Sequence, residues 1–181
     1  MPPTVRLATH ADVPAILDIY NEAVLNTTAS YDLEPVSLAS RLTWYDDKRA
    51  SGHPVFVAEV ADKVLDRSVL GWSTYGEFRA KPGYRYSAEH SVYVAAGSRG
   101  QGFGRALMRP IIEHARAAEI HVLIGGVDAS NAASMGLHLS LGFEQVAHFR
   151  QVGRKFDRWL DLAFVQLILD EGERSTLTAL L

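Results

Sequence analysis

Residues 99–104, Arg-Gly-Gln-Gly-Phe-Gly, are the first segment whose residue types and spacing indicate chemistry. Glycines at alternate positions let the backbone approach a ligand closely, because no Cβ stands in the way. If a helix follows, backbone N–H groups and the positive end of its dipole converge on an anion. Arg99 and Arg105 add positive charge. The loop therefore predicts a phosphate site, and the alternative is a plain flexible loop that leads into a helix.

The spacing of the glycines limits which phosphate ligand the loop can hold. A dinucleotide fingerprint requires glycine at the sixth position counted from Gly100, where this sequence has Arg105. A nucleoside triphosphate loop requires Gly-Lys followed by Ser or Thr, and the sequence contains no such run. Both common nucleotide motifs are therefore excluded.

The elements around this loop follow from the spacing of apolar residues. A strand is expected over residues 86–95, and a helix over 104–118 with Leu107, Ile111 and Ala115 on one face. Pro110 lies inside this helix and should remove a hydrogen bond and introduce a kink. Gly125 and Gly126 fall inside a later strand, which they weaken unless something must come close; a β-bulge is the alternative.

Further elements complete the expected architecture. Helices are predicted over residues 9–25, 37–51 and 131–141, and strands over 5–7, 55–60, 69–78, 121–127, 143–150 and 160–169, with a turn at Ala61-Asp62-Lys63. The first helix should bury one stripe, namely Val13, Ile16, Leu17, Tyr20, Ala23 and Val24, and the second should bury Leu38, Leu42 and Tyr45. A strand-loop-helix-strand unit in the centre implies one parallel pair.

The predicted fold class is α/β, or more closely an α+β mixed sheet that is mostly antiparallel and has helices on its faces. One domain is expected over residues 1–170, because a chain of 181 residues buries one full core and leaves little room for a second. Residues 171–181 are expected to form a C-terminal tail.

Several blocks, in the right order, resemble the GNAT superfamily of N-acetyltransferases. Residues 99–104 match its acyl-CoA loop pattern Arg/Gln-x-x-Gly-x-Gly/Ala, and similar blocks are RLATHADVPAILDIYNEAV, YSAEHSVYV, and NAAS leading to LHLSLGF. The blocks NTTASYDLEP, EHSVYV, NAASMGLH and VGRKFDRWLDLAFVQL resemble the branch that acetylates phosphinothricin and methionine sulfoximine. The resemblance covers nearly the whole chain and implies the GNAT acyl-CoA N-acyltransferase fold.

The resemblance also implies a site for acetyl-CoA as co-substrate. Residues 92–94 would pair with the pantetheine arm, residues 100–105 would hold the pyrophosphate, and Asn131 would contact the cofactor from the other side. The predicted cofactor-binding residues are Val92, Tyr93, Val94, Arg99, Gly100, Gln101, Gly102, Phe103, Gly104, Arg105 and Asn131.

Amide formation from a thioester requires a deprotonated amine, a polarised carbonyl and help for the departing thiolate. An α-amine is largely protonated at neutral pH, and a thiol of pKa about 8.5 is a moderate leaving group. By resemblance Glu89 is the candidate base, because apolar neighbours can raise its pKa or a water can relay the proton. His138 stands where many relatives carry a tyrosine that protonates the thiolate, and histidine can act as donor or base. Taken alone, Glu89 would be a solvated strand residue and His138 a structural one.

An amino-acid substrate needs a fixed cation for its carboxylate. Arg79, in YGEFRAK, resembles the branch's substrate arginine and can bind a carboxylate through two hydrogen bonds. The predicted substrate-binding residues are Arg79, Ala80, Lys81, Glu89, His90 and Ser91, and Tyr31 either covers the site or packs in the core. The sequence departs from the family at Leu139, where glutamate is common, and at Ala80-Lys81, where proline and an aromatic residue are common.

Composition excludes other chemistry. The chain has no cysteine, and 18 Lys+Arg against 21 Asp+Glu give a formal charge of −3. Disulfides, thiolate metal sites and a cysteine nucleophile are therefore excluded. No run of five like charges and no stretch of 18 apolar residues occurs, so neither a nucleic-acid partner nor a membrane span is expected, and the N-terminus is not that of a signal peptide. A cytoplasmic protein without a metal is expected.

The functional hypothesis is acetyl transfer from acetyl-CoA to a small amino-acid-like amine such as phosphinothricin, methionine sulfoximine or methionine sulfone. Two alternatives stay open at this point: another amine acceptor (a polyamine, an aminoglycoside or a protein N-terminus), or a CoA-binding module without catalysis. The segment at Trp159-Leu160 and the final strand resemble the part that supports dimers in this branch, so a homodimer is expected.

Overall fold

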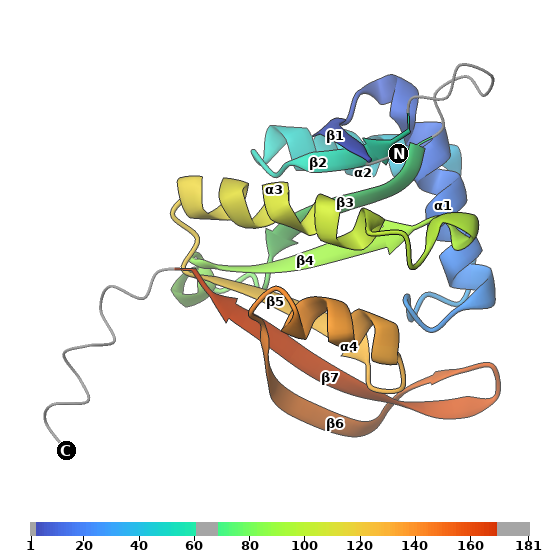
Figure 1. Ribbon diagram of the computed structural model, residues 1–181, viewed down its shortest axis with the longest axis vertical. Helices are drawn as coiled ribbons and strands as arrows, with labels where there is room; N and C mark the ends of the chain where they lie inside the picture. Colours follow the sequence, from blue (N-terminus) through green and yellow to red (C-terminus); the bar gives the residue numbers. More distant parts are fainter. Residues whose placement is uncertain (1–2, 61–68, 170–181) are drawn as a thin grey trace, which may run out of the picture.

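The computed structural model describes residues 3–60 and 69–169, and a seven-stranded sheet organises them (Figure 1). The strand order is β1-β2-β3-β4-β5-β7-β6, and only β4 and β5 are parallel neighbours. The strands are β1 (Thr4–Leu7), β2 (Val55–Glu59), β3 (Val69–Glu77), β4 (Ser87–Val94), β5 (Val122–Asp128), β6 (Glu144–Lys155) and β7 (Arg158–Ile168). This confirms the predicted mixed sheet with one parallel pair. The predicted turn at residues 61–63 and the tail over 171–181 lie outside the described residues.

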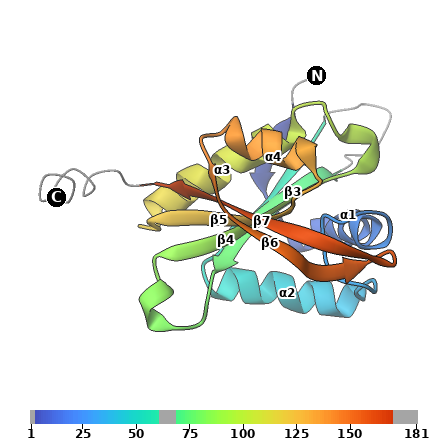
Figure 2. The same cartoon turned by 90° about the horizontal axis from the view of Figure 1, so that it is seen from below.

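Helices cover both faces of the sheet, as Figure 2 shows. On one face lie α1 (Val13–Asn26) and α2 (Leu38–Ala50), whose core with β2 and β3 includes Ile16, Tyr45 and Trp72. On the other face lie α3 (Phe103–Ala117) and α4 (Ala132–Leu139). The core beneath α3 includes Met108, Ile111 and Leu123. Within the described residues, no helix is both long and apolar enough to cross a membrane.

The helix faces differ in part from the predicted ones. A short 3₁₀ turn (His10–Asp12) precedes α1, and the capping box formed by Thr9 and Asp12 fixes its start. The buried stripe of α1 includes Ile19, whereas Leu17 and Tyr20 are only half-buried. The prediction of full burial was therefore wrong for those two, although Tyr20 packs against the core cluster of Val13, Ile16 and Ile19.

Three further differences concern α2, α3 and the C-terminal hairpin. In α2, Leu38 is exposed, and the buried residues are Arg41 and Tyr45. The helix α3 continues through Pro110 to Ala117, and the Ser73 hydroxyl donates to the Leu107 carbonyl at 3.0 Å in the preceding turn. The strand β6 extends five residues beyond the predicted end at 150, because two register shifts break the alternation that sequence reading relies on.

The parallel pair is short, and this positions the site. Pairing of β4 with β5 ends at Glu89 opposite Ile124. Beyond that point β5 stays paired with β7 in unbroken register, Gly125 opposite Val165 and Gly126 opposite Phe164. The bulge alternative for the two glycines is therefore wrong. The free edges of β4 and β5 diverge into a gap.

An ion cluster ties the N-terminal strand to the first helical turn. The Arg6 guanidinium donates to both Asp12 oxygens at 2.8 Å and to Glu59 Oε2 at 3.0 Å. These hydrogen bonds outweigh desolvation and lower the pKa of Asp12 from 3.8 to about 2. The ionised carboxylate of Asp12 therefore stabilises the folded state.

We expect Asp12→Asn to lower the free energy of unfolding by about 2 kcal/mol at pH 7, the equivalent of that pKa difference. The stabilisation is complete above the pKa that Asp12 has in the unfolded state and is lost as the pH falls through its pKa in the folded state. The difference in free energy of unfolding between the variant and the wild type should therefore narrow from pH 5 toward pH 3. Urea denaturation at each pH measures it. Asp18→Asn, at an exposed position of α1, is the matched control; equal loss in both variants would refute the assignment.

Candidate functional site

A long groove runs beside β4 on the side of α3 and α4. Its volume is about 520 Å³. Nine of the eleven sequence-predicted cofactor residues line it: Val92, Tyr93, Val94, Arg99, Gly100, Gly102, Gly104, Arg105 and Asn131. The other two do not: Gln101 Nε2 donates to the Gly97 carbonyl at 2.9 Å, and the Phe103 side chain is buried in the core with Leu107. We call this cavity the α3-side groove.

The glycine loop at this groove is held in a defined shape. Gly100 and Gly102 have φ values of +76° and +88°, which side chains rarely adopt, and Gly102 caps the start of α3. A Cβ on Gly104 would lie 2.9 Å from Leu137 Cδ2, so glycine allows α3 to approach α4. Arg105 donates to Ser140 Oγ at 2.6 Å, which bridges the same helices. The plain flexible loop is therefore the weaker interpretation.

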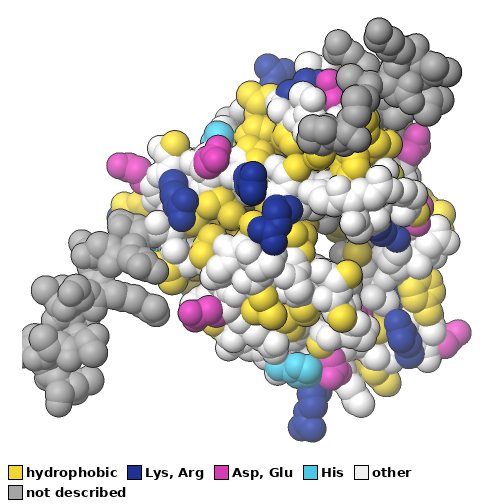
Figure 3. All heavy atoms as spheres, in the orientation of Figure 1, with side chains coloured by type: hydrophobic (Ala, Val, Ile, Leu, Met, Phe, Trp, Pro, Cys, Tyr) yellow, Lys and Arg dark blue, Asp and Glu magenta, His cyan; other side chains and the backbone are white. Residues whose placement is uncertain are grey.

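Positive charge surrounds the groove mouth. Figure 3 shows basic side chains on the face over α3. Arg105, at the start of α3, is exposed, whereas Arg99 is bound to Glu22 Oε2 at 2.6 Å and to the Val94 carbonyl at 3.1 Å. The N-terminus of α3 adds its dipole. Arg105 and the helix N-terminus therefore favour an anion at this end of the groove, although the chain is acidic overall.

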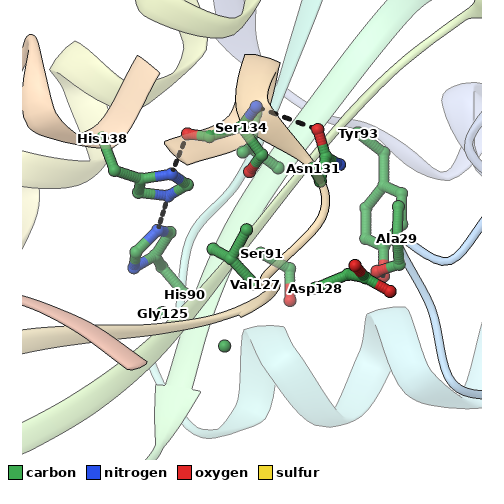
Figure 4. A pocket seen from close by; sticks show the side chains of 12 residues that line it. Ala29, His90, Ser91, Tyr93, Gly125, Val127, Asp128, Asn131, Ser134 and His138 are labelled. Carbon is green, nitrogen blue, oxygen red and sulfur yellow. Dashed lines mark hydrogen bonds between the residues drawn. The ribbon is translucent and has the colours of Figure 1, made fainter. Parts of the chain in front are cut away.

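A smaller cavity fills the gap where β4 and β5 diverge. Its volume is about 70 Å³, and we call it the strand-gap cavity. It shares Val92, Tyr93, Asn131 and Ser134 with the α3-side groove, so the two are continuous. Its remaining lining residues include His90, Gly125, Asp128 and His138 (Figure 4).

Two buried histidines meet at one end of this cavity. His138 Nδ1 lies 2.7 Å from the Ser134 carbonyl oxygen, and His138 Nε2 lies 2.9 Å from His90 Nε2 (Figure 4). A carbonyl only accepts, so Nδ1 carries the proton and the neutral ring accepts at Nε2 from His90 Nε2–H. A Cβ on Gly125 would lie 2.7 Å from His90 Cε1, so glycine makes room for that ring.

Burial disfavours the charged form of both rings. Desolvation lowers the pKa of His138, and it lowers the pKa of His90 further because the neighbouring imidazole also disfavours a charge there. His90 was predicted as a substrate residue; its ring packs against His138 and Phe143, and the residue also lines a cavity that Glu89 borders. The geometry favours a role in orienting His138, whose Nε2 is an acceptor in this arrangement.

Glu89 faces the other side of the sheet. Alternation along β4 places Glu89, Ser91 and Tyr93 toward α1 and α2, opposite to His90. Glu89 and Ser91 line a cavity of about 220 Å³ together with Tyr31 and Asp128, which we call the Glu89–Tyr31 cavity. Burial raises the pKa of Glu89, and the charge of Arg79 opposes part of that rise. A base of raised pKa suits proton removal near neutrality.

The predicted substrate segment 79–81 lies at the edge of this region. Arg79, Ala80 and Lys81 are exposed, and none of them lines the cavities described above. The Arg79 guanidinium lies 4.3 Å from the Phe78 ring centroid and donates to the Phe78 carbonyl. The structure thus brings Arg79 within electrostatic reach of Glu89 but not into the cavity wall.

Sequence reasoning missed two buried charged residues. Arg41 is 6% exposed, and its guanidinium lies 4.1 Å from the Tyr20 ring centroid in a cavity of about 310 Å³ that also borders Glu89. Asp128 ends β5 and lines both the strand-gap and the Glu89–Tyr31 cavities. The signals were present: Arg41 lies among apolar positions of its helix, and Asp128 follows a buried strand just before Asn131.

The cavities define a site with two entrances. The α3-side groove, with its glycine loop, leads into the strand-gap cavity from one side of the sheet. The Glu89–Tyr31 cavity leads to the same gap from the other side and shares Ser91, Gly126 and Asp128 with it. Such an arrangement suits group transfer between two ligands that meet between β4 and β5.

Comparison with known proteins identifies the class. Residues 5–164 match the family described as acetyltransferase (GNAT) domain. The chain therefore belongs to the GNAT acetyltransferase family, as the sequence blocks predicted.

Individual relatives narrow the comparison. The L-methionine sulfoximine/L-methionine sulfone acetyltransferase of Pseudomonas aeruginosa is 48% identical over 170 residues, which cover 94% of this chain and 96% of that protein. The structure of yncA, a putative acetyltransferase from Salmonella typhimurium with its cofactor acetyl-CoA, superposes with a TM-score of 0.89 at 44% identity, covering 94% and 96% of the two chains. A phosphinothricin acetyltransferase from Sinorhizobium meliloti in complex with AcCoA gives a TM-score of 0.89 at 34% identity, covering 96% and 91%.

We expect His138 to remain neutral, with its proton on Nδ1, throughout pH 6–8, because burial lowers its pKa and Ser134 accepts from Nδ1. Long-range ¹H–¹⁵N correlation spectra of histidine-labelled protein distinguish the tautomers. His10, which is exposed, serves as the internal control. A His138 resonance that titrates like a free imidazole, or that shows a protonated Nε2, would contradict the arrangement.

Proposed function

We propose that the protein transfers the acetyl group of acetyl-CoA directly to the amine of a small amino-acid-like substrate, such as methionine sulfoximine, methionine sulfone or phosphinothricin. The observation that carries the proposal is the two-sided gap between β4 and β5, with a phosphate-binding loop on one side and a buried carboxylate on the other. The substrates named for the relatives support the choice of acceptor. Such a reaction would detoxify amino-acid analogues.

The residues present fit acetyl-CoA as co-substrate. Within the described residues, β4 has no strand partner on its β5 side beyond Glu89, so the backbone of residues 92–94 can pair with an extended pantetheine arm, apart from the Val94 carbonyl, which accepts from Arg99. The loop 99–105 offers N–H groups and Arg105 to the pyrophosphate. When bound, acetyl-CoA supplies an acetyl thioester that an amine can attack.

Glu89 supplies the base in the proposed reaction. The acceptor enters as an ammonium ion, and Glu89 removes its proton, directly or through a water, because burial has raised the carboxylate's pKa. The free amine attacks the thioester carbonyl and the C–N bond forms. The C–S bond then breaks, and the second proton lost by the nitrogen passes to the departing thiolate, which leaves as the thiol. Arg79 holds the substrate carboxylate from the rim, with Lys81 and Ala80 beside it, and Ser91 lines the reaction space. Tyr31 closes the cavity.

Thiol release with methionine sulfoximine, methionine sulfone, phosphinothricin and a panel of polyamines and aminoglycosides tests the proposal. We expect turnover with the amino-acid-like amines. Glu89→Gln should lower kcat by about 10²–10⁴-fold, because it removes the base. The affinity for acetyl-CoA should not change, because Glu89 does not line the α3-side groove.

Glu77→Gln, an exposed glutamate at the end of the neighbouring strand, is the control and should retain wild-type activity. If none of the amines gives thiol release while acetyl-CoA still raises Tm, the enzymatic proposal is overturned in favour of a CoA-binding module. A preference for amines without a carboxylate, unaffected by Arg79→Ala, would replace the acceptor class.

We also propose a homodimer formed through the β6–β7 hairpin, in the cytoplasm, with neither a nucleic-acid nor a membrane partner and without a metal. The hairpin exposes large apolar side chains, namely Val146, Phe149, Val152, Phe156 and Trp159, and Trp159 is 60% exposed. Exposed apolar clusters of this kind support protein association. The absence of cysteine is compatible with a reducing compartment.

Light scattering after size exclusion tests the dimer. We expect twice the chain mass for the wild type and a shift to the monomer for Val152→Asp combined with Trp159→Lys, because charges in a dimer interface are not solvated. Leu33→Lys, at an exposed apolar position outside the hairpin, should leave the mass unchanged. A monomeric wild type at high micromolar concentration would refute the dimer.

A further inference from the structure

Asp128 lies where the two sides of the site meet. It ends β5, is 4% exposed, and lines the strand-gap cavity (Figure 4). It also lines the Glu89–Tyr31 cavity. Glu89 lines the second cavity from β4. Because β4 and β5 stop pairing at Glu89, the two carboxylates belong to opposite walls of the same opening.

One oxygen of Asp128 has a structural role. Oδ1 accepts from the Ser130 backbone N–H at 2.8 Å and from the Ser130 hydroxyl. The Asp128 carbonyl accepts from the Asn131 N–H at 2.8 Å, which leads the chain into α4. These contacts need only one acceptor oxygen, and an amide could supply it.

The second oxygen has no such explanation. Within residues 3–60 and 69–169, the buried Oδ2 has no hydrogen-bond partner, and Asp128 takes part in no ion pair. A buried carboxylate oxygen without a donor lowers stability, so such groups persist mainly where function requires them. Asp128 also acts on Tyr31, because burial and the negative charge of Asp128 both raise the pKa of the Tyr31 hydroxyl.

We propose that Asp128 and Glu89 form a subsite that binds the protonated amine of the acceptor, an inference that rests on the proposed function. An ammonium group has three N–H donors and a positive charge, so it can satisfy Oδ2 of Asp128 and the Glu89 carboxylate together. Glu89 then takes one proton from the ammonium, which leaves a neutral amine and a protonated Glu89. Asp128 takes no proton in this step and forms or breaks no covalent bond.

The two carboxylates thus have different tasks. Loss of Glu89 removes the base and lowers kcat, whereas loss of the charge on Asp128 weakens binding of the acceptor and raises its KM. Selectivity follows, because a neutral hydroxyl or thiol leaves the charge of Asp128 uncompensated and should bind poorly.

Asp128→Asn separates binding from structure, since the amide oxygen can still accept from Ser130 while the charge at Oδ2 is lost. With methionine sulfone at saturating acetyl-CoA, we expect KM to rise about 10- to 100-fold, the effect of one lost charge-assisted hydrogen bond. We expect kcat to change less than about threefold and the KM for acetyl-CoA to stay the same. At pH values above the pKa of the acceptor amine, the difference in KM between Asp128→Asn and the wild type should narrow, because the neutral amine offers no charge to Asp128.

The controls isolate the charge. Asp157→Asn, at a side chain that is 99% exposed on the β6–β7 turn, should leave every constant unchanged. Asp128→Glu, which keeps the charge, should keep more affinity for methionine sulfone than Asp128→Asn. If Asp128→Asn does not fold, Asp128→Glu and Ser130→Ala replace it: acceptor affinity must then follow the carboxylate and not the Ser130 hydrogen bond.

The outcomes are distinguishable. If the wild type turns over and folded Asp128→Asn keeps the wild-type KM for methionine sulfone, this inference alone is overturned. If the wild type releases no thiol, the proposed function is overturned. Calorimetric titration of methionine sulfone into the CoA-saturated wild type and Asp128→Asn then tests the subsite by itself. The subsite inference holds if binding depends on the charge of Asp128 and is wrong if it does not.

Discussion

The early end of the β4–β5 ladder is the constraint on which the rest of the site depends. Three paired positions join the parallel strands, and after Glu89 the two strands separate while β5 keeps its pairing with β7. Within the described residues, the separation leaves the backbone groups of β4 beyond Glu89 without a neighbouring strand on the β5 side. It also opens a passage through the sheet. Side chains that alternate along β4 therefore face different cavities on its two sides, which suits the proposed transfer between a large donor and a small acceptor.

Burial away from water is the second physical effect that shapes the site, and it shifts the pKa of the carboxylate and of the histidines in opposite directions. It raises the pKa of Glu89, which remains partly exposed, and it lowers the pKa of His90 and His138, which do not. One cause thus produces a stronger base on one face of β4 and a neutral histidine pair on the other. The pair is ordered by the Ser134 carbonyl, so the same helix that borders the α3-side groove also fixes the tautomer of His138.

The acceptor side is built from segments that are remote in the chain. Lys155, at the end of β6, donates to the Ser30 carbonyl at 2.7 Å and is 5% exposed. A Cβ on Gly153 would lie 2.5 Å from the Tyr31 ring, so glycine lets the hairpin contact the segment between α1 and α2. Tyr31 also donates to the Asp161 carbonyl. The β6–β7 hairpin therefore shapes the Glu89–Tyr31 cavity, which the proposed function assigns to the acceptor.

The sequence by itself determined the local features: the glycine loop before α3, the order of helices and strands, and the family. These depend on spacing between neighbours, since φ preferences and apolar periodicity act over a few residues. Sequence reasoning also located Glu89 and His138, through similarity to the family. It did not show that His90 would contact His138, that β6 would reach Lys155, or that Asp128 and Arg41 would be buried. Only the tertiary structure decided these, because burial and pairing between residues 48 or 125 positions apart depend on how the sheet is assembled and where its strands separate.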